Sequence, residues 1–188
     1  MSTAKSHADP DAGAPARGPA DLSAVWRVLA AIPDPEIPVV SIVDLGIVRS
    51  VAREDGGVVV RVTPTYSGCP ATDWILAAIR DELAAIGVPD ARVEIQLAPA
   101  WTTDWMAADA KRRMREFGIA PPGCAIAGSP SAVDVRGISP LRHTGVVVPC
   151  PRCGSARTRL TAQFGSTACK ALYRCDECLE PFDYFKPH

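Results

Sequence analysis

The chain has 188 residues, of which 47% are hydrophobic and 22% are charged, and its formal net charge at pH 7 is −1. This length fits one domain of ordinary size, or a small domain with an appendage, and it suffices to bury a core without disulfides or metals. The near-zero charge argues against a protein that binds nucleic acid by neutralising phosphates, and no run of the sequence approaches the roughly 18 consecutive apolar residues of a membrane span.

The seven cysteines are the most informative feature of the composition. The N-terminal residues lack the basic, apolar and cleavage-site series of a signal peptide, so we expect a cytoplasmic protein. In that compartment thiols stay reduced, and cysteines are more typical of metal ligands or reactive thiols than of a disulfide framework.

The first part of the chain predicts a tail, one helix and a hairpin. Residues 1–20 consist mainly of Ala, Pro, Gly, Ser and Asp, which bury too little apolar surface to offset the entropy of ordering, so we expect a disordered tail. Apolar residues recur at helical spacing over residues 22–32, and prolines end this helix. Residues 47–53 and 58–63 predict two strands, joined by the hairpin signal Glu54-Asp55-Gly56-Gly57.

The next elements complete a small domain. The apolar stripe of residues 71–86, followed by Gly87, predicts a second helix. Residues 92–97 alternate between apolar and polar side chains, which indicates a half-buried strand, and a third helix is expected over residues 103–117. The order over residues 21–118 is therefore α-β-β-α-β-α, an α+β fold in which helices pack against a three-stranded sheet.

The C-terminal part predicts a metal-binding module. Residues 119–145 are rich in Pro, Gly and Ser without sustained periodicity, so we expect a linker, and residues 146–188 hold five of the seven cysteines. Two C-x-x-C pairs in this segment are separated by 21 residues, a spacing typical of a zinc ribbon. The four cysteines are Cys150, Cys153, Cys175 and Cys178.

Four thiolates can complete a tetrahedral site with no open position for water, so we expect a structural ion, with Zn²⁺ as the default. A segment of this size builds little core of its own, and the metal would supply its folding energy. Because spacing alone does not separate zinc from iron, a rubredoxin-like electron carrier is the alternative.

Cys69 is a candidate for a second kind of site. It lies in the segment Thr63–Pro70, between the second predicted strand and the second helix, where Pro70 suits the first helical position and makes Cys69 the N-cap. The helix dipole and the unpaired N–H groups there favour a thiolate. All three histidines lie outside residues 21–118, so metal handling is favoured over nucleophilic catalysis. A cysteine that only fills the core is an equally supported interpretation.

Three further groups have weaker patterns. Asp34 and Glu36 lie in a proline-rich loop and could bind an ion or tune a thiol, although such residues more often cap a turn or stay solvated. Cys169, beside Lys170, is either a small half-buried residue, which we favour slightly, or an auxiliary thiolate able to hold or pass on a metal–sulfur species. Cys124 has no partner at a recognised spacing.

Several motifs resemble the metal–sulfur cluster assembly family, which includes SufT and small iron–sulfur targeting proteins. They are Asp34-Pro35-Glu36-Ile37-Pro38, Ser41-Ile42-Val43-Asp44-Leu45-Gly46-Ile47-Val48, and Thr63-Pro64-Thr65 with Gly68-Cys69-Pro70. This resemblance covers about residues 22–118. The segment Phe164–Cys175, between the two cysteine pairs, extends it, because the whole chain resembles the PaaD family of accessory proteins of the bacterial phenylacetyl-CoA epoxidase.

The resemblance implies an accessory protein of aerobic phenylacetate catabolism, and no enzyme. Its expected role is maturation: delivery of iron–sulfur clusters to the reductase component, with the epoxidase subunits and iron–sulfur assembly proteins as partners. The family's cysteine corresponds to Cys69, its acidic pair to Asp34 and Glu36, and iron or a cluster would bind there transiently.

Three alternatives stay open beside this role. They are a structural subunit that bridges oxygenase and reductase, the electron carrier described above, and, for assembly, a homodimer that presents two Cys69 thiolates. Neither a nucleic acid nor a membrane is expected as a partner. The chain has no Glu-x-x-His motif of a di-iron oxygenase, which counts against direct oxygen chemistry.

Overall fold

The computed structural model describes residues 21–123, 126–127 and 146–187. The tail expected for residues 1–20 lies outside these described residues, as do Cys124 and most of the expected linker. Within the described part, no helix is long and apolar enough to cross a membrane.

The first domain (residues 21–118) has the element order expected from the sequence. Helix α1 (Leu22–Ala31) precedes the hairpin of β1 (Val48–Glu54) and β2 (Gly57–Val62), and helix α2 (Ala71–Ala85) connects β2 to β3 (Arg92–Ile95). The sheet order is β1-β2-β3, with β1 antiparallel and β3 parallel to β2. The predicted α+β fold with a three-stranded sheet is thereby confirmed.

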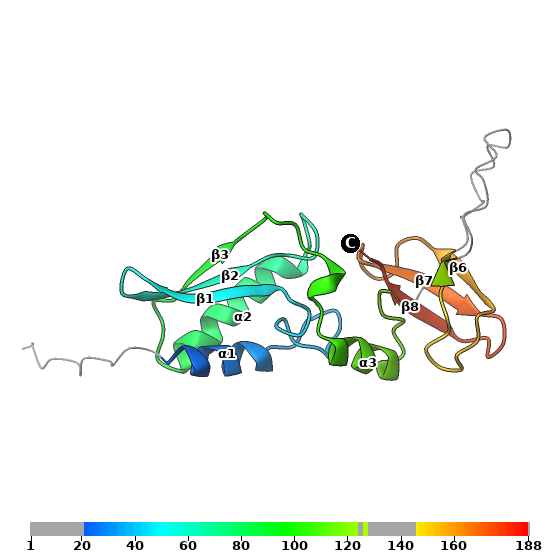
Figure 1. Cartoon of the computed structure of the whole chain (residues 1–188), viewed down its shortest axis with the longest axis horizontal. Helices are drawn as coiled ribbons and strands as arrows, with labels where there is room; N and C mark the ends of the chain where they lie inside the picture. The colour runs from blue at the N-terminus through cyan, green and yellow to red at the C-terminus, as the bar shows by residue number, and fades with distance from the viewer. Residues whose placement is uncertain (1–20, 124–125, 128–145, 188) are drawn as a thin grey trace, which may run out of the picture.

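Local sequence explains both connections in this sheet. Asp55 and Gly56 have φ values of 52° and 79°, the positive angles that a tight two-residue hairpin turn requires. Parallel strands need a crossover, which α2 supplies. Helices α1 and α2 lie on the same side of the sheet (Figure 1), and valines such as Val60 and Val62 are buried in the core there.

Two expectations for the first domain are wrong in part. The third helix does not run from residue 103: a 3₁₀ turn, η1 (Thr103–Trp105), is followed by extended backbone, and α3 spans Ala108–Phe117. The helix is interrupted where the N–H of Ala107 donates to the carbonyl of Asp44, at 2.9 Å. The strand expected over residues 92–97 ends at residue 95.

The apolar face of that strand is also only partly buried. Val93 packs against the core, but Ile95 and Leu97 are 48% and 62% exposed. The reason is position, because β3 is an edge strand of the sheet.

The ribbon (residues 146–187) is a second, smaller β structure. Its sheet has the order β6-β7-β8, all antiparallel, formed by β6 (Thr158–Ala162), β7 (Lys170–Cys175) and β8 (Pro181–Phe185). A short pair, β4 (Ile126–Ala127) with β5 (Val146–Val147), precedes it. In its small core, the ring of Tyr173 packs against the rings of both Phe182 and Tyr184.

The ribbon packs directly against the first domain and against the residues that immediately follow it. The N–H of Ala120 donates to the carbonyl of Asp183 at 2.8 Å, and the N–H of Phe185 donates back to Ala120 at 2.9 Å. The Phe185 ring meets the ring of Trp101 edge-on, with centroids 6.0 Å apart, and Phe185 and Cys169 belong to the core of the first domain. These contacts fix the ribbon beside α3 (Figure 1), and they bring residues from both parts to one site.

Candidate functional site

The two C-x-x-C pairs of the ribbon converge on one point. The Sγ atoms of Cys150 and Cys178 lie 3.7 Å apart, those of Cys153 and Cys175 lie 3.6 Å apart, and all four lie within 4.8 Å of one another. A tetrahedral zinc site with Zn–S bonds of about 2.3 Å has S···S edges of about 3.8 Å. The four cysteines thus form a metal-binding group with the geometry of a closed four-sulfur site.

The turns that carry these cysteines stabilise the sulfurs. Gly154 has a φ of 76°, and its N–H donates to the carbonyl of Cys150 at 2.9 Å, which closes the first turn. In the second turn the N–H of Glu177 donates to the Sγ of Cys175 at 3.4 Å. The backbone N–H of Cys178 lowers the pKa of Cys175 most, and neighbouring thiols lower it further, so this sulfur favours the thiolate form that binds a metal.

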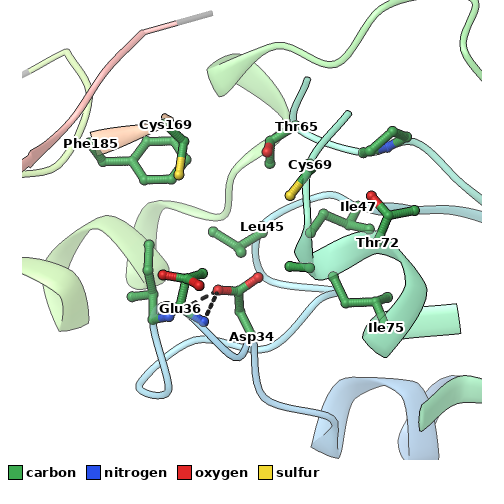
Figure 2. A pocket seen from close by; sticks show the side chains of 13 residues that line it. Asp34, Glu36, Leu45, Ile47, Thr65, Cys69, Thr72, Ile75, Cys169 and Phe185 are labelled. Atoms are coloured by element: carbon green, nitrogen blue, oxygen red, sulfur yellow. Dashed lines mark hydrogen bonds between the residues drawn. The ribbon is translucent and has the colours of Figure 1, made fainter. Parts of the chain in front are cut away.

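A second site lies between the two parts of the chain. We call it the interdomain pocket; it is formed by the loop after α1, the loop before α2 together with the start of that helix, and two residues of the ribbon (Figure 2). Its lining residues are Asp34, Glu36, Ile37, Leu45, Ile47, Pro64, Thr65, Cys69, Ala71, Thr72, Ile75, Cys169 and Phe185.

Cys69 is half-exposed, and its thiol is directed into the pocket (Figure 2). The expectation that Cys69 is the N-cap of the helix is wrong by one residue: Pro70 is the N-cap and already has helical angles. The first turn still closes on Cys69, because the N–H of Thr72 donates to the Cys69 carbonyl at 3.1 Å. The thiol therefore lies at the N-terminal end of α2, open to the pocket.

Tyr66 is a neighbour of this thiol that the sequence did not single out. Burial, and then the charges of Cys69 and Cys169, raise the pKa of Tyr66. Its hydroxyl therefore stays protonated beside the Cys69 side chain.

Asp34 is buried, with 6% of its surface exposed. One carboxylate oxygen accepts hydrogen bonds from the N–H groups of Glu36 and Ile37, both at 2.9 Å, and the other points into the pocket on the side of Cys69 (Figure 2). Burial raises the pKa of Asp34 despite these two hydrogen bonds. The two interpretations of Asp34, as a residue that caps a turn and as one that could bind an ion or tune a thiol, are therefore compatible. One of its oxygens stabilises the turn, and the other faces a thiol.

Glu36 is connected to the ribbon through a buried lysine. Lys170 is 4% exposed, and its Nζ lies 3.5 Å from Glu36 Oε2 and 3.8 Å from Asp183 Oδ2. No pattern in the sequence indicates this contact, because 134 positions separate the two partners and no periodicity relates them.

Cys169 is buried, as the favoured interpretation of the sequence expected in part, yet it lines the same pocket as Cys69. Its Sγ lies 3.1 Å from the Oγ1 of Thr167. Burial raises the pKa of Cys169, so the free side chain favours the neutral thiol.

Asp44, in contrast, has a structural place outside this pocket. It accepts hydrogen bonds from the N–H and the hydroxyl of Ser41, and it pairs with Arg113 of α3 at 2.7 Å. Burial raises the pKa of Asp44, but these donors outweigh it and the pKa is lowered. Asp44 thus fastens α3 to the loop after α1.

The comparisons with known proteins cover both parts of the chain. Residues 22–99 match the family described as "Iron-sulfur cluster assembly protein", and residues 139–186 match the "PaaD zinc beta ribbon domain". A protein of Escherichia coli (strain K12), named as a subunit of 1,2-phenylacetyl-CoA epoxidase, is 51% identical over 168 residues, which are 89% of this chain and 94% of that protein. The chain belongs to the PaaD family.

Other proteins resemble about half of this PaaD-family chain. The "Fe-S protein maturation auxiliary factor" of Porphyromonas gingivalis (strain ATCC BAA-308 / W83) is 36% identical over 97 residues, 50% of this chain and 89% of its own. A domain of unknown function, DUF59, from Bacillus anthracis has 31% identity and a TM-score of 0.44, covering 49% of this chain and 89% of that one. A Mycobacterium tuberculosis protein described as associated with Fe-S complex assembly and repair has 30% identity and a TM-score of 0.31, covering 56% and 96%.

Proposed function

We propose that the protein is an accessory factor that matures the phenylacetyl-CoA epoxidase system by delivering iron or an iron–sulfur cluster to one of its components. The observation that carries this proposal is the interdomain pocket, where the half-exposed thiol of Cys69 faces Asp34 and Glu36. Thiolates are the ligands that iron–sulfur species prefer. The names of the E. coli and P. gingivalis relatives support the same assignment.

The two sulfur sites would then have separate tasks. We assign Zn²⁺ to the four ribbon cysteines, where four protein ligands leave no position for exchange, and cargo to Cys69. The ribbon would dock the client, and the reductase component is the client we favour. Because the thiols of both sites have to stay reduced, we infer that the protein works in the cytoplasm.

We expect no catalytic activity of the protein itself. The described residues that line the pocket include no histidine, so the usual base for a cysteine nucleophile is missing from that lining. Metal analysis distinguishes a structural zinc site in the ribbon from the alternative, an iron site that carries electrons. A colourless protein with one zinc per chain supports the structural role, whereas iron in that site and a red colour would indicate an electron carrier.

Cluster transfer tests the proposal directly. Wild type and Cys69→Ser are incubated anaerobically with ferrous iron and sulfide and then mixed with the cluster-free reductase, whose absorbance and activity report the transferred cluster. Cys124→Ser is the matched control, because it removes one thiol by the same substitution. We expect transfer from wild type and from the control, and a loss of at least tenfold for Cys69→Ser; equal transfer from all three would remove Cys69 from the mechanism.

A bridging subunit is the second candidate, favoured by the word "subunit" in the name of the E. coli relative. It predicts that the protein copurifies with the epoxidase in a fixed ratio. It also predicts that the reductase from cells lacking the protein has a full complement of cluster. A deficit of cluster in those cells supports maturation instead.

A further inference from the structure

We propose that Cys169 of the ribbon is a second sulfur ligand of the cargo site, so that Cys69, Cys169 and Asp34 together bind one ferrous ion between the two parts of the chain. This inference rests on the proposed function and specifies its cargo site. The pocket contains two thiols and two carboxylates, and its two thiols are 100 positions apart in the sequence (Figure 2).

The first argument is that the structure holds Cys169 in place. Its carbonyl accepts a hydrogen bond from the N–H of Lys186 at 3.0 Å, so its backbone is paired at the end of the β7–β8 ladder. The neighbouring Lys170 binds Glu36 across the domain boundary, and Phe185 anchors the same end of the ribbon on Trp101. The Cys169 side chain is therefore held at the pocket by contacts of its own segment with both the ribbon and the first domain.

The second argument is the chemistry of the donors. Two sulfurs and a carboxylate oxygen suit a borderline soft divalent ion such as Fe²⁺ and do not suit Mg²⁺ or Ca²⁺, which prefer oxygen ligands alone. Glu36 is not needed as a ligand, because Lys170 already neutralises it. With both thiols and Asp34 ionised, the three ligands carry three negative charges against the two positive charges of the ion. Any proton that either thiol carries before binding is therefore released to solvent when the ion binds.

The third argument is size. The space in the pocket that is open to the centre of a water molecule is about 20 Å³, which corresponds to roughly one water molecule. A single ion fits this space, and a preformed cluster with several iron and sulfur atoms does not. The three donors are not gathered as closely as the four ribbon sulfurs, so they have to close on the ion, as suits cargo that is later released.

X-ray absorption at the iron edge tests the ligand set without a mutation. The full chain, with its ribbon loaded with zinc, receives one equivalent of ferrous iron under anaerobic conditions. We expect about two sulfur and two or more oxygen neighbours around iron, with zinc retaining four sulfurs. One sulfur, or none, would overturn the role of Cys169, and four sulfurs at iron would show that iron has displaced zinc from the ribbon and would overturn it equally.

Binding measurements on variants separate this inference from the proposed function. Ferrous iron is titrated into zinc-loaded wild type, Cys69→Ser, Cys169→Ser and the control Cys124→Ser, and zinc content and melting temperature confirm that each is folded. We expect at least a tenfold weaker association for both pocket variants and no change for the control. If only Cys69→Ser is impaired in binding and in cluster transfer, the proposed function stands and the role of Cys169 is refuted. If no variant changes iron binding but Cys69→Ser fails in transfer, the single-ion site is refuted alone.

Discussion

Replacing Lys170 by methionine tests whether buried ion pairs hold the ribbon against the first domain. The Nζ atom lies 3.5 Å from Glu36 and 3.8 Å from Asp183, and the lysine side chain is 5% exposed. At an effective dielectric constant of about 20, each pair at such a distance has a Coulomb energy of about 4–5 kcal/mol. Most of this energy is offset by the cost of taking the ammonium out of water.

The net effect lies between the values for buried and for surface pairs. Glu36 and Asp183 are 33% and 28% exposed, so each regains water when the lysine is lost. We therefore expect Lys170→Met to lower the free energy of unfolding by about 1–3 kcal/mol. For a chain of this size the melting temperature would fall by about 2–12 °C.

Lys186→Met is the matched control on the same ribbon. Lys186 donates to the carbonyl of Gln163 at 3.1 Å and lies over the Phe164 ring, both on the surface, so its loss is expected to cost less than about 0.5 kcal/mol. Thermal melts of the two zinc-loaded variants are compared with the rate at which an alkylating reagent labels Cys169. Equal stability and equal labelling for the two variants would show that Lys170 does not fasten the ribbon.

Three further predictions concern the turn after Leu45, the buried carboxylate and the ribbon metal. Gly46→Ala is expected to cost about 3 kcal/mol or more, because its φ is 72° and the added Cβ would lie 2.7 Å from Trp105; Gly56→Ala, with a φ of 79° in open space, should cost only about 1 kcal/mol in the same urea titration. Asp34→Asn should raise the melting temperature at pH 8, because burial raises the pKa of Asp34 and its ionised form is disfavoured in the folded state. The higher melting temperature of the variant relative to wild type should disappear as the pH falls through the raised, folded-state pKa towards the ordinary value of 3.8. Chelation of the ribbon metal should abolish hydrogen-exchange protection in β7 and β8 while β1 and β2 stay protected, and loss of protection in both sheets together would contradict a ribbon that folds by its metal.

Short-range patterns explain what the sequence predicted well. Helix α2 and the β1–β2 hairpin follow from apolar spacing and from Asp55-Gly56, and each pattern is read within about a dozen residues. The four-sulfur group followed from the spacing of two C-x-x-C pairs, because a shared ion demands that their turns converge.

Long-range packing explains what the sequence missed. The break before α3 depends on a hydrogen bond to Asp44, and the exposure of Leu97 depends on the edge position of β3. The same holds for the pocket: Cys69 was singled out from its local turn, whereas its proximity to Cys169 depends on how the ribbon docks. Propensity and periodicity carry no information on that contact. The one relevant signal in the sequence was the position of Cys169 beside Lys170, which indicated Cys169 as a possible auxiliary thiol.

The difference between the two sulfur sites explains how one small protein could keep one metal and release another. In the ribbon an ion would have four protein sulfurs, which lie within 4.8 Å of one another, so an incoming ligand would find no free position. In the interdomain pocket, the proposed set of two sulfurs and a carboxylate would leave a position open, and the single oxygen ligand would bind a borderline soft ion less tightly than the sulfurs. On the proposed function, Asp34 would be the ligand most easily exchanged for a client thiolate, whereas four sulfur ligands would retain zinc in the ribbon and keep Cys169 in position. On this reasoning the ribbon metal is a condition for cargo binding: a chain whose four ribbon cysteines are replaced by serine, and which therefore binds no ion there, should bind ferrous iron as weakly as Cys169→Ser. Undiminished binding would show that the two sites are independent.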